Sequence, residues 1–243
     1  MNFKLNQDIH CWFYEVNPTP KNLAYFEGLI DLEERERCNR FKFRKDKEVH
    51  ITARAILRIL TGHYLNMDPK EITFAYNEFN KPRYAEVNSL KFNISYSGNM
   101  IVLGFVQNFE IGVDIEKIKT DVHVMNIARN FFSQKEVKVL KSVSLKDRYR
   151  AFFRCWTRKE AFIKAEGSGL SFPLDSFAVS LDSDVDAKLL ETQWNPSEKQ
   201  QWKIFSFLPS NDYIAAVAIK GAVDMIKYKN LNDYETNGFQ FIS

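Results

Sequence analysis

The sequence predicts an α+β fold in which each half of the chain combines one long helix with antiparallel strands. Two long segments, 46–65 and 147–166, carry apolar residues at the helical period of 3.6 residues. Shorter segments with alternating apolar residues lie around them and are separated by turn residues such as Gly98 and Asn99. Both halves therefore repeat the same rough order of elements, although their sequences are too dissimilar to establish an internal repeat.

Composition and charge exclude several classes of protein. The chain has 243 residues, enough for one large domain or two small ones with a substantial core. Its net charge of +3 is too small to indicate a nucleic-acid-binding protein. No apolar run reaches the roughly 18–20 residues that cross a bilayer, and the N-terminus lacks a signal-peptide pattern. The three cysteines and four histidines show no metal-ligand spacing, so we expect reduced thiols and a cytoplasmic protein.

The first half begins with an expected edge strand, Ile9–Val16, which a proline-containing turn closes. A dense run of charged residues, Asp31–Arg40, then predicts a short helix, and the segment 46–65 predicts a long amphipathic one. Further strands are expected at Ile72–Tyr76, Leu90–Ser95 and Met100–Val106.

A row of basic side chains follows the long helix of the first half. His50, Arg54 and Arg58 stand at four-residue spacing and so lie on one side of that helix. The row is either a solvated basic face or a cradle for an anion, because guanidinium groups pair well with phosphate oxygens. The sequence alone leaves both interpretations open.

The helices of the second half have recognisable starts and stops. A helix is expected at Val122–Phe132, and the residues from Ser133 to Glu136 form a capping box that opens another. Asp147 is expected to cap the long helix, and Gly167 is expected to end it.

The rest of the second half predicts strands and loops. Strands are expected at Phe177–Leu181, Trp202–Leu208 and Tyr213–Lys220. The polar segment Asp182–Lys199 is expected to form a loop or hairpin. The residues from Gly221 onward show a weak pattern and are expected to form a peripheral extension.

Two carboxylates share one face of the strand predicted at Ile111–Glu116. The two-residue period of a strand places Gly112, Asp114 and Glu116 on the same side. Like charges this close repel each other unless a cation binds. Because only oxygen ligands are nearby in the sequence, a hard ion such as Mg²⁺ would suit them. The alternative is a strand end that carries two solvated acids.

The second long helix carries a carboxylate and an ammonium beside its apolar side. Trp156, Glu160 and Lys164 form one row at four-residue steps. The simplest interpretation is an ordinary stabilising pair worth about 0.2–0.5 kcal/mol. The second acidic site, about forty residues earlier, favours a functional role.

These two stretches together resemble the motifs of the Sfp-type 4′-phosphopantetheinyl transferases. Gly112–Glu116 resembles the family's G-(V/I)-D-(I/V)-E motif. Trp156–Leu170 resembles W-(S/T)-x-K-E-(A/S)-x-x-K-x-x-G-x-G-L, the form found in the W/KEA branch. Either motif alone would be a weak signal, but both in this order and at this spacing are specific. The resemblance covers about residues 26–220.

Weaker motifs extend the resemblance, with two departures. Asn93-Ile94-Ser95 and Asn80-Lys81-Pro82 match further family motifs, and Arg54 stands where the family's first long helix carries a CoA-contacting arginine. Tyr96 replaces the histidine expected to contact a CoA phosphate, and a phenol carries no charge at neutral pH. Asn80 replaces a glycine of the family turn, where asparagine tolerates positive φ. We interpret both departures as changes in CoA affinity.

The resemblance implies a pseudo-two-fold pair of similar α/β lobes, each a long helix on a small antiparallel sheet. The division would place the first lobe at 1–109, the second at 110–220 and an extension at 221–243. A monomer is expected, with CoA bound between the lobes. The implied reaction moves the 4′-phosphopantetheine arm of CoA to a serine of an acyl or peptidyl carrier protein and releases 3′,5′-ADP.

The resemblance also implies roles for the site residues. Asp114, Glu116 and Glu160 would hold Mg²⁺ against the CoA diphosphate. Glu160, or a water beside the metal, would take the serine proton, and Lys164 would meet the charge that develops on the phosphate. The residues expected to bind CoA are Arg54, Lys81, Arg83, Ser95, Tyr96 and Lys164, with His50 a weaker candidate.

Carrier proteins are acidic helical domains, so the family resemblance implies a basic docking surface with apolar anchors. Lys135, Lys138, Val139 and Lys141 are the candidates, although the same residues also fit a solvated helix face.

Two rival functions remain at this point. A non-catalytic protein that binds CoA or a carrier would be consistent with the departures at Tyr96 and Asn80. A magnesium-dependent phosphohydrolase could use the same carboxylates on a free nucleotide, but nothing beyond the acids supports it.

Overall fold

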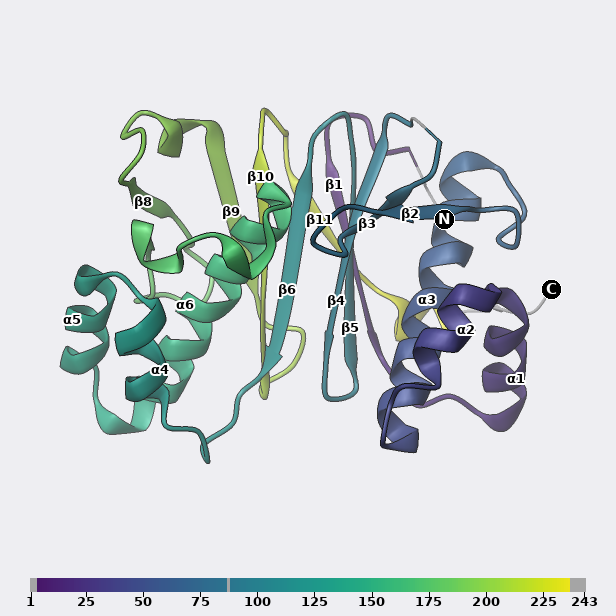
Figure 1. Ribbon diagram of the computed structural model, residues 1–243, viewed down its shortest axis with the longest axis horizontal. Helices are drawn as coiled ribbons and strands as arrows, with labels where there is room; N and C mark the ends of the chain where they lie inside the picture. The colour runs from purple at the N-terminus through teal and green to yellow at the C-terminus, as the bar shows by residue number, and fades with distance from the viewer. Residues whose placement is uncertain (1–3, 87, 237–243) are drawn as a thin grey trace.

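The computed structural model describes residues 4–86 and 88–236, which build successive helix, sheet, sheet and helix layers (Figure 1). The helices are α1 (Pro20–Leu29), α2 (Leu32–Cys38), α3 (Arg44–Leu65), α4 (Val124–Phe131), α5 (Gln134–Ser142), α6 (Leu145–Glu166) and α7 (Leu231–Thr236). The strands are β1 (Ile9–Glu15), β2 (Phe74–Tyr76), β3 (Pro82–Tyr84), β4 (Leu90–Ser97), β5 (Met100–Gln107), β6 (Ile111–Lys117), β7 (Phe177–Val179), β8 (Leu189–Thr192), β9 (Trp202–Phe207), β10 (Tyr213–Lys220) and β11 (Ile226–Asn230). Within this described part of the chain, no helix combines the length and apolarity that crossing a membrane requires.

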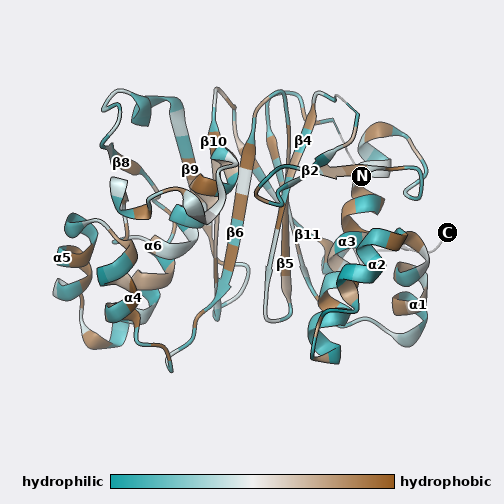
Figure 2. Ribbon diagram, viewed as in Figure 1, coloured by the Kyte–Doolittle hydropathy of each residue, from teal (hydrophilic) through white to brown (hydrophobic). Residues whose placement is uncertain are grey.

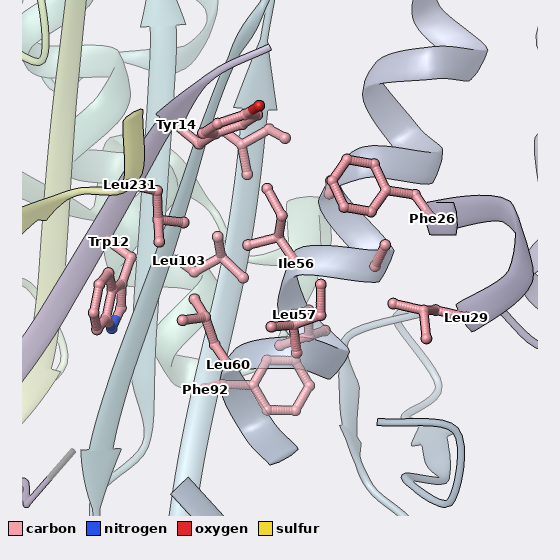
Figure 3. Packing of buried hydrophobic residues seen from close by; sticks show 14 of the residues in the cluster. Trp12, Tyr14, Phe26, Leu29, Ile56, Leu57, Leu60, Phe92, Leu103 and Leu231 are labelled. Carbon is pink, nitrogen blue, oxygen red and sulfur yellow. The ribbon is translucent and has the colours of Figure 1, made fainter. Parts of the chain in front are cut away.

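The first lobe packs α1, α2 and α3 on a four-stranded sheet of order β11-β1-β5-β4. Its core joins the buried side of α3 to the sheet, as Ile56, Leu57, Leu60, Phe92 and Leu103 illustrate (Figure 3). The prediction of an edge strand at 9–16 was wrong, because β1 pairs with β5 on one side and with β11 on the other. Burial on both faces explains this position, since interior strands read as nearly continuous apolar runs.

The segment after Gly221 differs from the expected peripheral extension. Strand β11 runs parallel to β1 and completes the first sheet. Leu231 is fully buried in the first core and points into it beside Trp12 (Figure 3). The Asn232 side chain bonds the backbone of Glu15 in both directions, accepting from its N–H at 2.8 Å and donating to its carbonyl at 3.0 Å. Residues 237–243, which also belong to the expected extension, lie outside the described residues.

The second lobe packs α6 on a three-stranded antiparallel sheet of order β6-β10-β9. A further core lies between the two sheets and includes Cys11, Val102, Val113, Ile115 and Val217. Figure 2 shows the hydrophobic stretches along central strands such as β5, and hydrophilic residues along α2. The expected mixed α+β architecture, with one long helix on each small sheet, is confirmed.

The helix boundaries follow local capping chemistry. Ser133 and Glu136 form both bonds of the expected capping box, and Gly167 ends α6 with a φ of 77°. The predicted cap of α6 was wrong by three residues. Ser144 is the N-cap, and its hydroxyl oxygen accepts from the backbone N–H of Asp147 at 3.2 Å.

Candidate active site

Gly112 allows α6 to lie directly against β6. A Cβ atom at this position would stand 2.0 Å from the carbonyl oxygen of Ala161 and 2.4 Å from the backbone nitrogen of Ala165. Only a glycine fits such an approach of helix to strand. The glycine therefore makes room for the helix, which brings Glu160 and Lys164 to the strand that carries Asp114.

Asp114 and Lys164 form a close ion pair across this contact. Lys164 Nζ lies 2.6 Å from Asp114 Oδ1, and the buried Asp114 comes from the face of β6 that the helix covers. The Ser95 hydroxyl on β4 donates to the same Oδ1 at 3.0 Å and accepts from Lys164 Nζ at 3.0 Å. One side chain from the first lobe thus joins a pair from the second.

The seam between β4 and β6 extends this contact along both strands. Asn93 Oδ1 accepts from the backbone N–H of Val113 at 2.8 Å, and the Ser97 hydroxyl donates to Glu116 Oε2 at 2.9 Å. The polar face of β4 therefore holds the acidic face of β6 in place. Glu116 lies at the outer end of this seam.

The pKa values of the three predicted carboxylates are all raised, mainly by burial. Burial raises the pKa of Asp114, although the Lys164 ammonium opposes that rise. Burial and then the charge of Asp114 raise the pKa of Glu116. Burial, followed by the charges of Asp114 and Glu116, raises the pKa of Glu160 from 4.5 to about 7. Negative charge is therefore concentrated where α6 meets β6.

Two oxygen atoms of this cluster lack a hydrogen-bond donor. Asp114 Oδ2 and Glu160 Oε1 are buried and make no hydrogen bond. Buried acceptors without a partner are rare and costly, and a hard cation with its waters would satisfy both. Within residues 4–86 and 88–236, no three His, Cys, Asp or Glu side chains stand ready as a metal site. The other carboxylate oxygen of Asp114, Oδ1, is paired with the Lys164 ammonium.

A cleft of about 590 Å³ lies between the two lobes beside this cluster. Glu160 and Lys164 of α6 form part of one wall, and Phe79, Lys81 and Pro82 of the first lobe belong to the other. A cavity of about 340 Å³ adjoins it and is lined by Lys81 and the exposed Arg83. Lys81 Nζ lies 2.9 Å from Glu110 Oε2. Lys81 and Arg83 thus border the neighbouring cavity, and Lys81 alone of the two borders the cleft.

Arg54 is not among the residues that line this cleft. It is 5% exposed, with Nε 2.5 Å from Glu34 Oε1 and its guanidinium 4.5 Å above the Phe74 ring. Arg58 is 1% exposed and lies 2.8 Å from the other Glu34 oxygen. The interpretation of this row as a solvated basic face was therefore wrong, because both arginines are buried against Glu34 of α2, and Asp31 also pairs with Arg58 at 2.6 Å.

Tyr96 and His50 form a pair close to Arg54. The Tyr96 hydroxyl lies 2.8 Å from His50 Nδ1, and Tyr96 is partly exposed. Burial and then the charge of Arg54 lower the pKa of His50 to about 4, so its imidazole is neutral at pH 7. Arg37, which the sequence analysis missed, stacks 3.8 Å above the Tyr76 ring and also lowers the pKa of His50. Its only sequence signal is the four-residue spacing from Glu33.

The motif residues between Trp156 and Glu160 hold the helix in place. Lys159 is fully buried, lies 2.9 Å from Glu136 Oε2 and donates to the carbonyl of Phe177 at 2.6 Å. Arg158 is also fully buried and donates to the carbonyl of Ser180 at 2.7 Å. The sequence analysis assigned no role to either residue, although the capping box at Glu136 was recognised.

The candidate docking residues lie on the exposed side of α5. Lys135, Lys138, Val139 and Lys141 are all exposed, and Lys135 pairs with Glu191. Leu145, the first residue of α6, is 75% exposed.

Comparisons with known proteins address both lobes. A family model described as "4'-phosphopantetheinyl transferase, N-terminal" matches residues 14–107, and one described as "4'-phosphopantetheinyl transferase superfamily" matches residues 110–218. The 4'-phosphopantetheinyl transferase HetI of Nostoc sp. is 30% identical over 89% of this chain and 90% of its own length. The 4'-phosphopantetheinyl transferase Sfp of Bacillus subtilis is 36% identical over 65% of this chain and 70% of its own. A further 4'-phosphopantetheinyl transferase of Bacillus subtilis is 37% identical over 64% and 68%. This chain therefore belongs to the Sfp-type 4′-phosphopantetheinyl transferase family.

Proposed function

We propose that the chain transfers the 4′-phosphopantetheine arm of CoA to a serine of an acyl or peptidyl carrier protein and releases 3′,5′-ADP. The observation that carries this proposal is the meeting of Asp114, Glu160 and Lys164 beside the interlobe cleft. Two buried carboxylate oxygens without a donor and one ammonium suit a diphosphate that arrives with a cation.

The reacting oxygen belongs to the carrier protein. Its serine hydroxyl attacks the phosphorus that bears pantetheine, the bond from that phosphorus to the bridging oxygen breaks, and 3′,5′-ADP leaves. Glu160, or a water beside the metal, is the candidate base for the serine proton, because the Glu160 carboxylate borders the cleft and its Oε1 makes no hydrogen bond. Lys164 neutralises charge on the phosphoryl oxygens as it develops.

Asp114, Glu116 and Glu160 would hold Mg²⁺ at this site. When bound, the ion neutralises the diphosphate and polarises its phosphoryl oxygens. The orphan oxygens of Asp114 and Glu160 support this assignment, and the mutual repulsion of the carboxylates provides the driving force. Lys164 would shift from Asp114 toward the substrate as the metal neutralises that carboxylate.

CoA would lie along the cleft with its diphosphate at the carboxylates of β6 and α6 and its ribose phosphate toward the first lobe. Ser95 is 3.0 Å from both Asp114 and Lys164, which supports a role beside the diphosphate. The charges of Arg54 and Lys81 suit the adenosine phosphates, to which the neutral Tyr96–His50 pair can offer a hydrogen bond, and Arg83 is a weaker candidate. Because Arg54 is already paired with Glu34, we assign it a long-range attraction and not a bidentate contact.

The partner we propose is an acidic acyl or peptidyl carrier protein that docks on α5. We propose that the protein acts as a monomer of two lobes, 1–109 and 110–220, in which β11 from the segment after residue 220 completes the sheet of the first lobe. The exposed lysines 138 and 141 and the apolar Val139 support this surface. We propose a cytoplasmic site of action without nucleic-acid or membrane partners, in line with the small net charge.

The test is to mix the protein with CoA, MgCl₂ and purified apo carriers of the fatty-acid, polyketide and nonribosomal-peptide types. Intact-mass measurement should show that at least one carrier gains one phosphopantetheine, and that EDTA prevents the gain. No mass gain with any carrier, alongside measurable CoA binding, would favour a non-catalytic binding protein. Release of phosphate from free nucleotides without a carrier would favour a phosphohydrolase.

A further inference from the structure

Residues 77–83, here called the arm, separate two cavities. The 590 Å³ cleft and the 340 Å³ cavity are both lined by Lys81 and Pro82 of the arm, and both reach Gly167 at the end of α6. The pairing of β2 with β3 holds the base of the arm. Because open space lies on both sides of the arm, its position against α6 depends on a few specific contacts.

Asn77 makes bonds of two kinds. Its Oδ1 accepts from the backbone N–H groups of Phe79 at 3.0 Å and Lys81 at 2.8 Å, which fixes the turn of the arm. Asn80 in that turn has a φ of 62°. The Nδ2 of Asn77 points the other way and donates to the carbonyl of Gly167 in the second lobe at 2.9 Å. One side chain thus shapes the arm and attaches it to the catalytic helix.

The carbonyls at the end of α6 need such donors. The last carbonyls of a helix have no partner within the helix and carry partial negative charge. Lys81 Nζ lies 3.4 Å from the carbonyl of Ala165, two residues before the carbonyl that Asn77 binds. The Phe79 side chain packs near Gly169, where a Cβ atom would lie 3.1 Å from the Phe79 Cβ. The arm therefore completes the C-terminal cap of α6.

We propose that Asn77 is a positioning residue that sets the wall of the CoA cleft opposite Glu160 and Lys164. This inference rests on the proposed function, because it assumes that the cleft binds CoA. Since α6 is buried along β6 independently of the arm, loss of the Asn77 bond loosens the arm against α6 and leaves the helix in place, while the pairing of β2 with β3 still anchors the base of the arm. CoA affinity then falls, and the chemical step and carrier binding are retained.

The test compares Asn77→Asp with Asn77→Ser and with the control Asn88→Asp. Aspartate keeps the acceptor that shapes the turn but loses the donor to Gly167. The shorter serine loses the bond to Gly167 without adding charge, and its hydroxyl can still accept a bond in the turn. Asn88 accepts from the Leu90 N–H at 2.8 Å in a similar turn and lines the neighbouring cavity, so its variant adds the same charge nearby. CoA binding is measured by calorimetry, carrier loading gives kcat and both KM values, and melting reports stability.

Both Asn77 variants should raise the Kd and the KM for CoA about tenfold, the factor that corresponds to about 1.4 kcal/mol. Their kcat and their KM for the carrier should stay within about twofold, and Asn88→Asp should resemble wild type. Unchanged CoA affinity in the folded Asn77 variants, or an equal loss in Asn88→Asp, would overturn the inference. Wild-type protein that binds CoA but loads no carrier would instead refute the proposed function and leave the binding comparison intact.

Discussion

Replacing Glu160 by Gln should stabilise the metal-free protein at alkaline pH and abolish carrier loading. The Glu160 carboxylate is half-buried beside Asp114 and Glu116, and its Oε1 has no hydrogen-bond donor. Gln keeps nearly the same shape without the charge. A variant that is more stable than wild type but inactive would show that the charge of Glu160 destabilises the fold and is required for activity.

The size and pH range of the effect follow from the pKa of Glu160, which is about 7 in the folded protein and ordinarily 4.5. At about 1.36 kcal/mol per pH unit, this difference corresponds to roughly 3 kcal/mol, which screening by solvent reduces to about 1–2 kcal/mol. Because the pKa of Glu160 is higher in the folded than in the unfolded chain, the protonated carboxyl favours the folded state. This contribution to stability is fully present below pH 4.5 and is lost as the pH rises through about 7. The advantage of Gln should therefore be absent near pH 4 and complete above pH 8.

The assay is thermal melting from pH 4 to 9 in EDTA, with Glu78→Gln as the control. Glu78 is an exposed acid that lines the same cleft. We expect Glu160→Gln to raise Tm by about 2–8 °C at pH 8, because 1 kcal/mol shifts the Tm of a chain this size by about 2–4 °C. A Tm at pH 8 that equals or falls below wild type, or an equal gain in the control, would refute the electrostatic reasoning.

Three further substitutions test other parts of the structure. Lys164→Ala should lower the turnover of carrier loading by about 10²-fold, as expected for loss of one group that stabilises developing charge; an effect on CoA KM alone would make Lys164 a binding group. Gly112→Ala should displace α6 and abolish loading while lowering the free energy of unfolding by at least about 1–3 kcal/mol, so an active variant with an unchanged denaturant midpoint would contradict the packing of helix on strand. Leu231→Ala should cost about 2–5 kcal/mol in the same measurement, and a cost near zero would mean that the C-terminal segment does not belong to the first core.

The sequence predicted the site residues of the second lobe best, because they occur in pairs that lie close together in the sequence. The strand period placed Asp114 and Glu116 together, and the helix period placed Glu160 above Lys164. The strand period also placed Gly112 on the acidic face of the strand, without showing why a glycine stands there. A glycine between two strand residues indicates a close approach, but the sequence does not say whether a ligand or a helix makes it.

The first lobe was harder to predict because its contacts join distant parts of the chain. The pairing of β1 with β11 links residues such as Trp12 and Lys229, and no local pattern specifies that register. In the sequence, two arginines at four-residue spacing give the same pattern whether their side chains are solvated or buried. Only the meeting of α2 with α3 shows that Glu34 neutralises Arg54.

Asn77 shows the same limit within the candidate site. Its place in a turn was visible from the sequence, since Asn-rich segments before proline commonly turn. Its bond to Gly167 spans the two lobes and depends on where α6 ends. Such a contact becomes apparent only once both lobes are placed.

The central claim is that carboxylates from β6 and α6 hold one divalent ion against the diphosphate of CoA. Titration of Mn²⁺ as a substitute for Mg²⁺, followed by the electron paramagnetic resonance signal of the free ion, measures this directly in the presence of CoA. The account predicts that wild-type protein with CoA binds one Mn²⁺ at least about tenfold more tightly than CoA alone, and that Asp114→Asn loses this gain. Equal Mn²⁺ affinity in wild type and Asp114→Asn would contradict it.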